Sequence, residues 1–279
     1  MSFTVFLAVL GAACLHATWN ACIKTGTSKQ TAMLIMTVWQ GIIGVLIVVW
    51  RPLPGGEVWP WLIASGVVHM FYQLFLAYAY EQGDLSRVYP LARGVAPMLV
   101  LLVSIMALPD VVAPMEYAGV VVIGCGIACM AWGALAAGES RALIPYALGA
   151  ACATAAYTVI DGVGARISGD PVTYVGWILL MSGFFYLPAV LALKGWGIVR
   201  ASPRDWLVGA FTGGASLASY TIVISAMSVA PIALVAALRE TSILFAMLIG
   251  WLVFRDKMDR LKAVAGLLIV AGVVLTRLG

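Results

Sequence analysis

Long apolar stretches alternate with short polar breaks along the whole chain. Charged residues are rare inside the stretches and gather between them, and proline or glycine marks several of the breaks, as at 51–56 and 109–114. Apolar runs of about 20 residues have the length of a helix that crosses a bilayer. The pattern therefore predicts ten membrane-spanning helices, at residues 3–23, 31–50, 58–80, 86–107, 115–136, 143–163, 171–193, 205–228, 232–254 and 260–278.

The composition agrees with a chain whose solvent is lipid. Of the 279 residues, 63% are apolar and only 10% are charged, whereas a soluble domain carries about 25% charged residues. This predicts an all-α membrane protein. The net charge of +4 comes without a clustered basic face, so nucleic acid is not an expected partner. The five cysteines lie inside apolar runs and predict neither a disulfide framework nor a metal site.

The two halves of the sequence repeat each other. Gly-Ala-Ala-Cys occurs at residues 11–14 and again at 149–152, a spacing of 138, and Arg93 matches Arg239 at a spacing of 146. Because each half has an odd number of helices, the second copy must enter the membrane from the opposite face. This is the inverted-repeat plan of many transporters, in which the substrate site lies near mid-membrane between the halves. The predicted five-helix units are 1–138 and 143–279.

The positions of Lys and Arg predict the orientation in the membrane. If Arg93 and Arg239 are set aside as lying inside helices, 11 of the 16 basic residues fall on one side and three on the other. Cytoplasmic loops carry the excess of basic residues. Both termini are therefore predicted to be non-cytoplasmic, and the expected location is a bacterial inner membrane. The first apolar segment has no basic residues before it, so it is interpreted as a retained helix and not as a cleaved signal.

Several ionisable residues fall at bilayer depth, where each costs a few kcal/mol on insertion scales and needs a reason. Arg93 and Arg239 are predicted to lie near the two ends of one central cavity, where they meet a substrate carboxylate or hold a gate. Snorkelling to the nearest headgroups is the alternative. Glu240 and Asp161 are the expected anionic partners of Arg239. His16, and also His69, are candidates for relaying protons, with a hydrogen-bonded packing role as the alternative.

Aromatic side chains with polar tips suit a cavity that holds organic molecules, although many of them can instead anchor the helices at the interface. Gln40 and Ser216 are further polar candidates. The predicted cavity and gating residues are His16, Trp19, Asn20, Trp39, Tyr72, Gln73, Tyr78, Tyr89, Arg93, Tyr157, Asp161, Trp177, Tyr220, Arg239 and Glu240. The sequence contains no enzyme motif, and no cofactor is predicted.

Glycines mark a second kind of surface, one for close helix packing. Gly119, Gly124 and Gly126 occur on the fifth predicted helix, and Gly266 and Gly272 on the tenth. Small residues let helix backbones approach closely in a membrane. These two helices are predicted to pack at the pseudo-two-fold axis as scaffold, while the third, fourth, eighth and ninth helices move around the cavity.

One stretch resembles a known family. Residues 238–242 (Leu-Arg-Glu-Thr-Ser), followed by Gly-Trp at 250–251, Phe-Arg-Asp at 254–256 and the run 265–273, are similar to the ninth and tenth helices of EamA-type members of the drug/metabolite transporter superfamily. The resemblance covers the rest of the chain as architecture. It implies proton-linked or facilitative movement of small organic metabolites, and the exporters of aromatic and other amino acids are the most similar subgroup.

The first half also resembles the four-helix small multidrug carriers. That alignment places His16 where those carriers have an essential glutamate, which argues against cation export by their mechanism. The sequence thus predicts a monomeric alternating-access exporter of amino acids, aromatic ones included, with the substrate, the bilayer and, as an open option, protons as partners. A translocase for lipids or lipid-linked metabolites, a multidrug or cation exporter and a non-transporting scaffold subunit remain alternatives.

Overall fold

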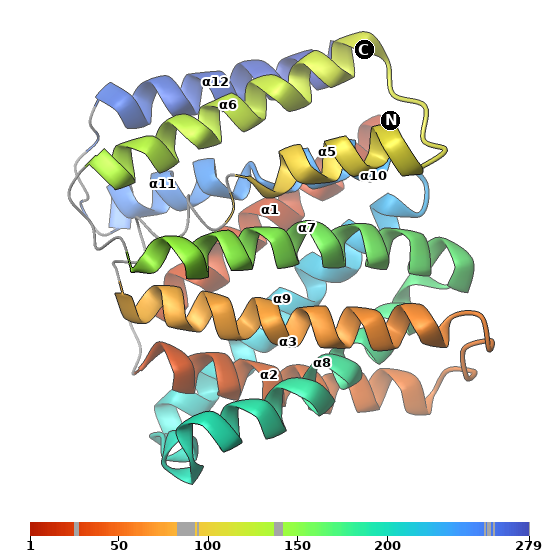
Figure 1. The fold of residues 1–279 in the computed structure, drawn as a ribbon, viewed down its shortest axis with the longest axis vertical. Coiled ribbons are helices and arrows are strands. Elements are labelled where there is room, and N and C mark those ends of the chain that lie inside the picture. Colours follow the sequence, from red (N-terminus) through yellow and green to blue (C-terminus); the bar gives the residue numbers. More distant parts are fainter. Residues whose placement is uncertain are drawn as a thin grey trace.

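The structure, a computed structural model, describes residues 1–24, 28–82, 93, 95–136, 142–253, 255, 258 and 260–278. The regular secondary structure of these residues is entirely helical (Figure 1). Its helices are α1 (Phe3–Lys24), α2 (Lys29–Val49), α3 (Trp59–Gln82), α5 (Ala96–Ala107), α6 (Pro114–Ala136), α7 (Leu143–Ser168), α8 (Pro171–Lys194), the short 3₁₀ helix η1 (Trp196–Val199), α9 (Pro203–Met227), α10 (Ile232–Arg239), α11 (Ser242–Val253) and α12 (Arg260–Leu278).

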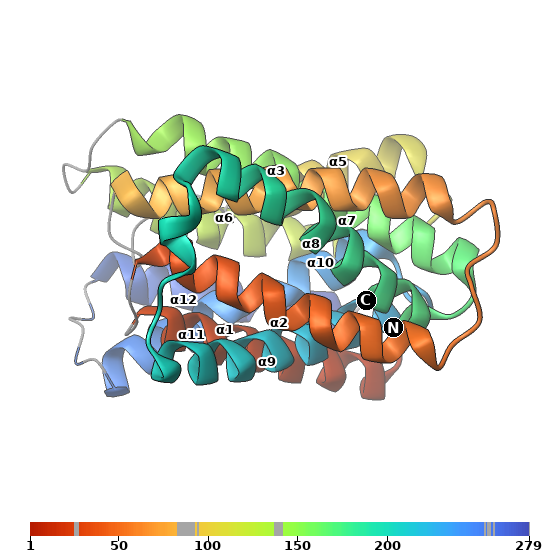
Figure 2. The same cartoon turned by 90° about the horizontal axis from the view of Figure 1, so that it is seen from below.

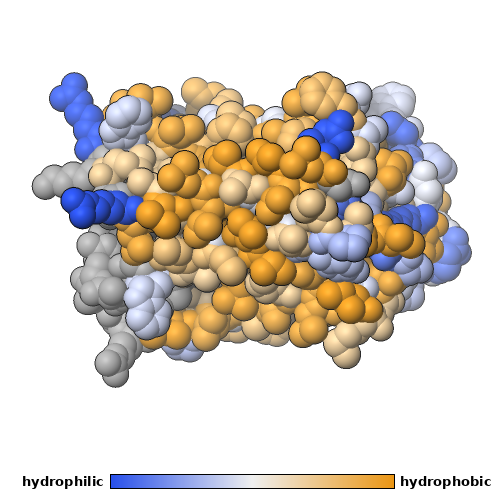
Figure 3. All heavy atoms as spheres, turned by 90° about the horizontal axis from the view of Figure 1, so that it is seen from above, coloured by the Kyte–Doolittle hydropathy of each residue, from blue (hydrophilic) through white to orange (hydrophobic). Residues whose placement is uncertain are grey.

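The lengths and apolarity of these helices confirm a membrane protein. Within the described part of the chain, nine spans are long and apolar enough to cross a bilayer, with α10 and α11 together forming one of them, and α5 is a shorter apolar helix. Hydrophobic side chains form a broad band around the middle of the visible surface, and hydrophilic side chains gather beyond it (Figure 3). Both chain termini lie at the same end of the bundle (Figure 1), which we call the termini end.

The predicted ninth helix is the segment where the sequence prediction was wrong. Residues 232–254 were expected to form one helix, but they divide into α10 and α11. The N–H groups of Glu240 and Thr241 donate to the carbonyls of Ala237 and Leu238, three residues back instead of four. Such a tightened 3₁₀ turn interrupts an α-helix and often marks a functional hinge. Of the predicted helix 86–107, only Arg93 and the part from residue 95 onward are described, and α5 begins at Ala96.

The helices form two layers that repeat each other. Figure 2 shows α3, α5, α6, α7 and α8 in one layer and α1, α2, α9, α11 and α12 in the other. Contacts between helices come in matched sets. The contact of α1 with α9 corresponds to that of α7 with α3, and the contact of α2 with α9 corresponds to that of α8 with α3. In the same way, the contact of α1 with α11 corresponds to that of α7 with α5. The pairs α6 with α12 and α2 with α8 each join the two layers. Each set is related by exchange of the two halves, as two inverted five-helix repeats require.

The α6–α12 pair is held together by glycines, as predicted. A Cβ atom on Gly272 would lie 2.7 Å from the backbone oxygen of Gly119, and a Cβ atom on Gly119 would lie 2.7 Å from the backbone oxygen of Gly272. Because backbone atoms cannot move aside as a side chain can, only glycine permits this approach. Neither helix lines the cavity described below, so the pair serves as scaffold.

This contact gives a first prediction. Gly272→Leu should force α6 and α12 apart and destabilise the protein by about 1–3 kcal/mol or more, because overpacked cores cost that amount. Gly41→Leu is the matched control, since a Cβ atom there meets nothing within 4 Å. The measurement is thermal unfolding in detergent, monitored as the loss of the monodisperse peak in size-exclusion chromatography. Equal melting temperatures for the two variants would contradict the scaffold role.

Candidate functional site

A cavity lies between seven helices of the bundle. The empty space in it is about 700 Å³, a volume that includes the part open to solvent. Side chains from α1, α2, α3, α7, α8, α9 and α10 form its wall, so both repeats contribute. The lining residues are His16, Trp19, Met33, Met36, Gln40, His69, Tyr72, Gln73, Tyr157, Ile178, Leu179, Ser182, Ser216, Ser219, Tyr220, Val223 and Arg239. A concave, largely apolar wall with a few converging polar groups is the usual form of a small-molecule site.

Seven of the fifteen predicted cavity and gating residues line this cavity, namely His16, Trp19, Tyr72, Gln73, Tyr157, Tyr220 and Arg239, and so do the further candidates His69, Gln40 and Ser216. Arg93, Asp161 and Glu240 are buried behind its wall and contact it through other side chains, as described below. Tyr89 lies outside the described residues.

The remaining four predicted residues have structural contacts. Trp39 Nε1 donates to the carbonyl of Trp206 at 3.0 Å, which joins α2 to α9. Asn20 donates to the carbonyl of His16 on its own helix. Tyr78 stacks on Tyr146, and Trp177 packs edge-on against Trp59. None of the four is among the residues that line the cavity.

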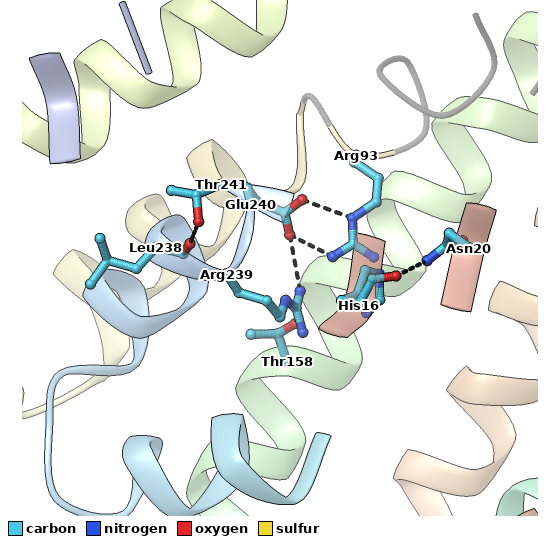
Figure 4. A network of polar contacts seen from close by, with 8 residues as sticks. All are labelled: His16, Asn20, Arg93, Thr158, Leu238, Arg239, Glu240 and Thr241. Atoms are coloured by element: carbon cyan, nitrogen blue, oxygen red, sulfur yellow. Dashed lines mark hydrogen bonds and ion pairs between the residues drawn. The ribbon is translucent and has the colours of Figure 1, made fainter. Parts of the chain in front are cut away.

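Two arginines converge on one carboxylate at the break between α10 and α11 (Figure 4). Arg93 Nε and Nη2 donate to Glu240 Oε2 and Oε1, both at 2.7 Å. Arg239 Nη2 donates to the same Oε1 at 3.3 Å and to Thr158 Oγ1 at 3.3 Å. All three charged side chains are buried. The expectation that Arg93 and Arg239 lie at opposite ends of the cavity is therefore wrong, because one oxygen binds both guanidinium groups.

Arg239 also faces the cavity. Its guanidinium carbon lies 5.9 Å from the centre of the Tyr157 ring. Its buried Nε–H has no hydrogen-bond partner among the residues that the structure describes. A buried donor without a partner costs about 1–3 kcal/mol, so this group is suited to an acceptor that arrives in the cavity.

A second charged group lies behind another part of the wall. Asp161, fully buried on α7, accepts a hydrogen bond from the hydroxyl of Tyr220 on α9. Its Oδ2 is also 3.9 Å from Nε2 of His69 on α3. Asp161 forms no ion pair with Arg239 within the described part of the chain, although it was predicted as a partner of that residue. The His69 ring stacks on Tyr157, with 4.2 Å between ring centres.

Two hydrogen bonds between the repeats are symmetry mates. Gln40 on α2 donates to Ser216 on α9 at 3.1 Å, and Gln73 on α3 donates to Ser182 on α8 at 3.2 Å. Ser182 was missed in the sequence, together with Met33, Met36, Ile178, Leu179, Ser219 and Val223. One signal for Ser182 was present, because the spacing of 142 that aligns Gly41 with Gly183 also aligns Gln40 with Ser182.

At the termini end, a third arginine connects several segments through hydrogen bonds. Arg166, at the end of α7, donates from Nη1 to Asp110 at 2.7 Å, and from Nε and Nη2 to the carbonyls of Met227 and Ala230 at 2.8 Å each. Asp110 also accepts from the backbone N–H of Ile232 at 2.9 Å. We call these residues the Arg166 cluster. It joins the α5–α6 connection, α7 and the turn between α9 and α10.

A more exposed ion pair lies at the same end. Arg51 donates to Asp170 at 3.1 Å, and Asp170 caps α8 through Val172 and Thr173. Partial burial alone would raise the pKa of the Asp170 carboxyl, but the hydrogen bonds from Thr173 and Val172 and the charge of Arg51 outweigh it and lower this pKa.

Comparison with known proteins places this architecture in a family. The sequence pattern of the EamA-like transporter family matches the chain twice, over residues 3–132 and 142–278. The chain belongs to the EamA-like transporter family. The two matches cover nearly all of both halves, so this EamA-like protein is a membrane transporter of small molecules.

Structural comparison supports the fold of this EamA-like transporter. A solved structure titled "Crystal structure of protein" matches it with a TM-score of 0.77 and 20% sequence identity, over 100% of this chain and 98% of the other. At that identity the likeness establishes the fold alone. The search of curated proteins found no match.

Proposed function

We propose that this EamA-like transporter exports amino acids, aromatic ones included, by alternating access. The observation that carries the proposal is the Arg239 guanidinium, which lines the cavity and has an Nε–H without a hydrogen-bond partner in the described structure. A carboxylate is the natural ligand of a guanidinium group, because it accepts charge-assisted hydrogen bonds in matching geometry. Glu240 occupies the Nη2 side of the same group and orients it toward the cavity.

The aromatic wall supports the rest of the substrate assignment. Trp19, Tyr72, Tyr157 and Tyr220 surround the space next to Arg239. Their faces provide apolar contact area for a substrate side chain without fixing its shape. An amino acid with a carboxylate at Arg239 and an apolar or aromatic side chain among these rings fits both features. The residues of this wall fit a lipid-linked sugar or a permanent cation less well than they fit an amino acid.

The orientation proposed from the sequence fits the arrangement of the helices. Arg51, Arg166 and Arg277 belong to helix ends at the termini end, while the larger group of basic residues in the sequence belongs to the connections at the opposite end. By the positive-inside rule, the opposite end faces the cytoplasm and both termini face away from it. We place the protein in a bacterial inner membrane in this orientation.

The experiment is uptake of labelled phenylalanine by proteoliposomes that carry Arg239→Lys. This variant keeps the positive charge and loses the planar donor pair. Loss of a charged hydrogen bond of about 1.5–3 kcal/mol predicts a KM raised by about tenfold or more. Arg93→Lys is the matched control, because Arg93 binds the same carboxylate but is not a lining residue. It should reduce stability and kcat, and leave KM near that of the wild type.

Two outcomes would contradict the proposal. The first is a wild-type protein, folded and monodisperse, that moves no amino acid. The second is an unchanged KM in Arg239→Lys, which would remove Arg239 from the substrate site.

A further inference from the structure

We propose that His69 and Asp161 form a proton-binding site in the cavity wall, and that a proton and the ammonium group of the substrate compete for it. The inference rests on the proposed function, since it requires an amino acid as substrate. It adds the coupling ion, the residues that bind it and the reason why export would draw on a proton gradient.

The hydrogen bonds of His69 fix where a proton can bind. His69 Nδ1 lies 3.0 Å from the backbone carbonyl oxygen of Ser65 and 3.2 Å from the Ser65 hydroxyl oxygen, which can accept a hydrogen bond as well as donate one. A carbonyl oxygen only accepts hydrogen bonds, so Nδ1 carries a hydrogen and donates it. In the neutral ring, Nε2 then has a lone pair, and this nitrogen lies 3.9 Å from Asp161 Oδ2. Two acceptors face each other across this gap, which a bound proton would convert into an imidazolium–carboxylate ion pair.

The local pairing of the buried charges favours a proton at this place, because two arginines balance two carboxylates in number but both guanidinium groups lie on Glu240. Glu240 is compensated by the two guanidinium groups that bind it. Asp161 Oδ2 accepts a hydrogen bond from the Tyr220 hydroxyl, and the hydroxyls of Ser65 and Tyr174 also interact with this carboxylate, but its Oδ1 has no hydrogen bond within the distance limit among the described residues. An ionised carboxylate that is fully buried requires a paired charge or becomes neutral. Binding of one proton by the pair satisfies this requirement, whichever of the two side chains holds it.

The other charged and titratable groups near the pair can be named helix by helix. Tyr157 on α7 stacks on His69, Tyr220 on α9 binds Asp161, and Tyr174 on α8 and Arg239 on α10 act on the pair electrostatically. His16 on α1 lines the same cavity, but its charged neighbours are the guanidinium groups of Arg93 and Arg239 (Figure 4). Of the two cavity histidines, only His69 has a carboxylate within ion-pair distance in the described part of the chain, at 3.9 Å. The structure thus favours His69 over His16 as the proton carrier.

One ring connects this site to the carboxylate site. Tyr157 has His69 stacked at 4.2 Å and the Arg239 guanidinium carbon at 5.9 Å from its centre. In this proposal, a substrate whose carboxylate binds Arg239 extends its ammonium group along Tyr157 toward His69, behind which Asp161 is buried. The ammonium group and an imidazolium carry the same charge and compete for one carboxylate. Each state of the cavity thus holds either a proton or a substrate, which is the requirement for exchange of the two across the membrane.

The test combines two transport assays on the full-length protein in proteoliposomes. The first is accumulation of labelled phenylalanine driven by a pH gradient. The second is counterflow, the exchange of labelled for unlabelled phenylalanine at equal pH, which needs no net proton movement. His69→Gln and Asp161→Asn should lower gradient-driven accumulation by about tenfold or more, while counterflow is reduced but measurable. Two variants are used because either one alone could fail to fold, and each is first checked for a monodisperse peak.

Two controls make the result specific. Glu116→Gln removes another buried carboxylate, which binds the backbone N–H of Ala113 away from the cavity, and should respond to the gradient like the wild type. His16→Gln should bind substrate more weakly and still release one proton per substrate bound, measured with a pH-sensitive dye in weakly buffered detergent solution. His69→Gln should release none.

The outcomes separate the two proposals. If His69→Gln and Asp161→Asn keep both counterflow and full gradient-driven accumulation, the proposed proton site is wrong. The proposal that the protein exports amino acids is then unaffected. If proton release is lost in His16→Gln but not in His69→Gln, the proton binds at His16, and the proposed site at His69 and Asp161 is wrong. Absence of counterflow in the wild type overturns the proposed function itself, and with it the competition.

Discussion

Glu240→Gln will destabilise this transporter by about 3–5 kcal/mol, the cost of removing one partner from a buried ion pair. Glutamine has nearly the same shape as glutamate, so the loss does not come from packing. It comes from the two guanidinium groups of Arg93 and Arg239, which then remain buried without their shared carboxylate. The measurement is the free energy of unfolding in detergent, from denaturant titration followed by tryptophan fluorescence.

Two further variants separate charge from other causes. Glu116→Gln changes a buried carboxylate that binds a backbone N–H and, among the described residues, no arginine, and should cost only about 1 kcal/mol. Arg93→Met combined with Glu240→Gln leaves one guanidinium without its carboxylate in place of two and should be more stable than Glu240→Gln alone. If Glu240→Gln unfolds at the same denaturant concentration as the wild type, the two arginines do not depend on this carboxylate.

The ion cluster and the break in the helix belong together. Glu240 is the residue at which α10 ends, and its N–H donates to a carbonyl three residues back. The turn places Arg239 toward Thr158 and the cavity, and Glu240 toward Arg93. Two adjacent residues on an unbroken helix would point about 100° apart, since each turn has 3.6 residues. A movement of α10 relative to α11 would therefore change the position of Arg239 in the cavity, and binding at Arg239 would favour one arrangement of the break.

Hydropathy and the internal repeat were sufficient to predict most of the fold. The membrane spans followed from apolar lengths, and the packing of α6 on α12 followed from Gly119 and Gly272. The break at 240–241 could not be predicted, because residues 239–242 contain neither glycine nor proline. At this break Glu240 pairs with an arginine 147 residues earlier in the chain, which is a tertiary interaction that local sequence does not record.

The candidate site was only partly predictable for a related reason. The repeat in the sequence aligns Arg93 with Arg239, and counting turns from the helix ends places them at different depths. Their convergence on one oxygen depends on how the helices are interrupted and packed. Ser182 and Met33 were missed because serine and methionine are common throughout apolar helices, and the cavity wall uses them without a distinguishing pattern.

Arg166→Ala will open the termini end of the protein. In this structure the Arg166 cluster connects α7 to Asp110 and to the turn before α10, so it holds together segments that the proposed alternating access would separate. Loss of charged hydrogen bonds worth about 1.5–3 kcal/mol shifts the balance between closed and open states by about 10- to 150-fold. The readout is the labelling rate of Val223→Cys, a buried cavity residue in the last turns of α9. An impermeant maleimide is added from the side that carries the termini, in a background without the five native cysteines.

Arg51→Ala is the matched control, because Arg51 also pairs with an aspartate at this end. The side chains of Arg51 and Asp170 are 44% and 37% exposed, whereas those of Arg166 and Asp110 are 26% and 10% exposed. Exposed pairs contribute only about 0–1 kcal/mol, so its labelling rate should stay within about fivefold of the wild type. If Arg166→Ala and Arg51→Ala label equally, depth of burial does not matter at this end and the cluster is not what closes it. Faster labelling in Arg166→Ala alone would identify the separation of α7 from the α9–α10 turn as the opening step. Because α10 also carries Arg239, that step would join access at the termini end to the position of the guanidinium that we propose binds the substrate.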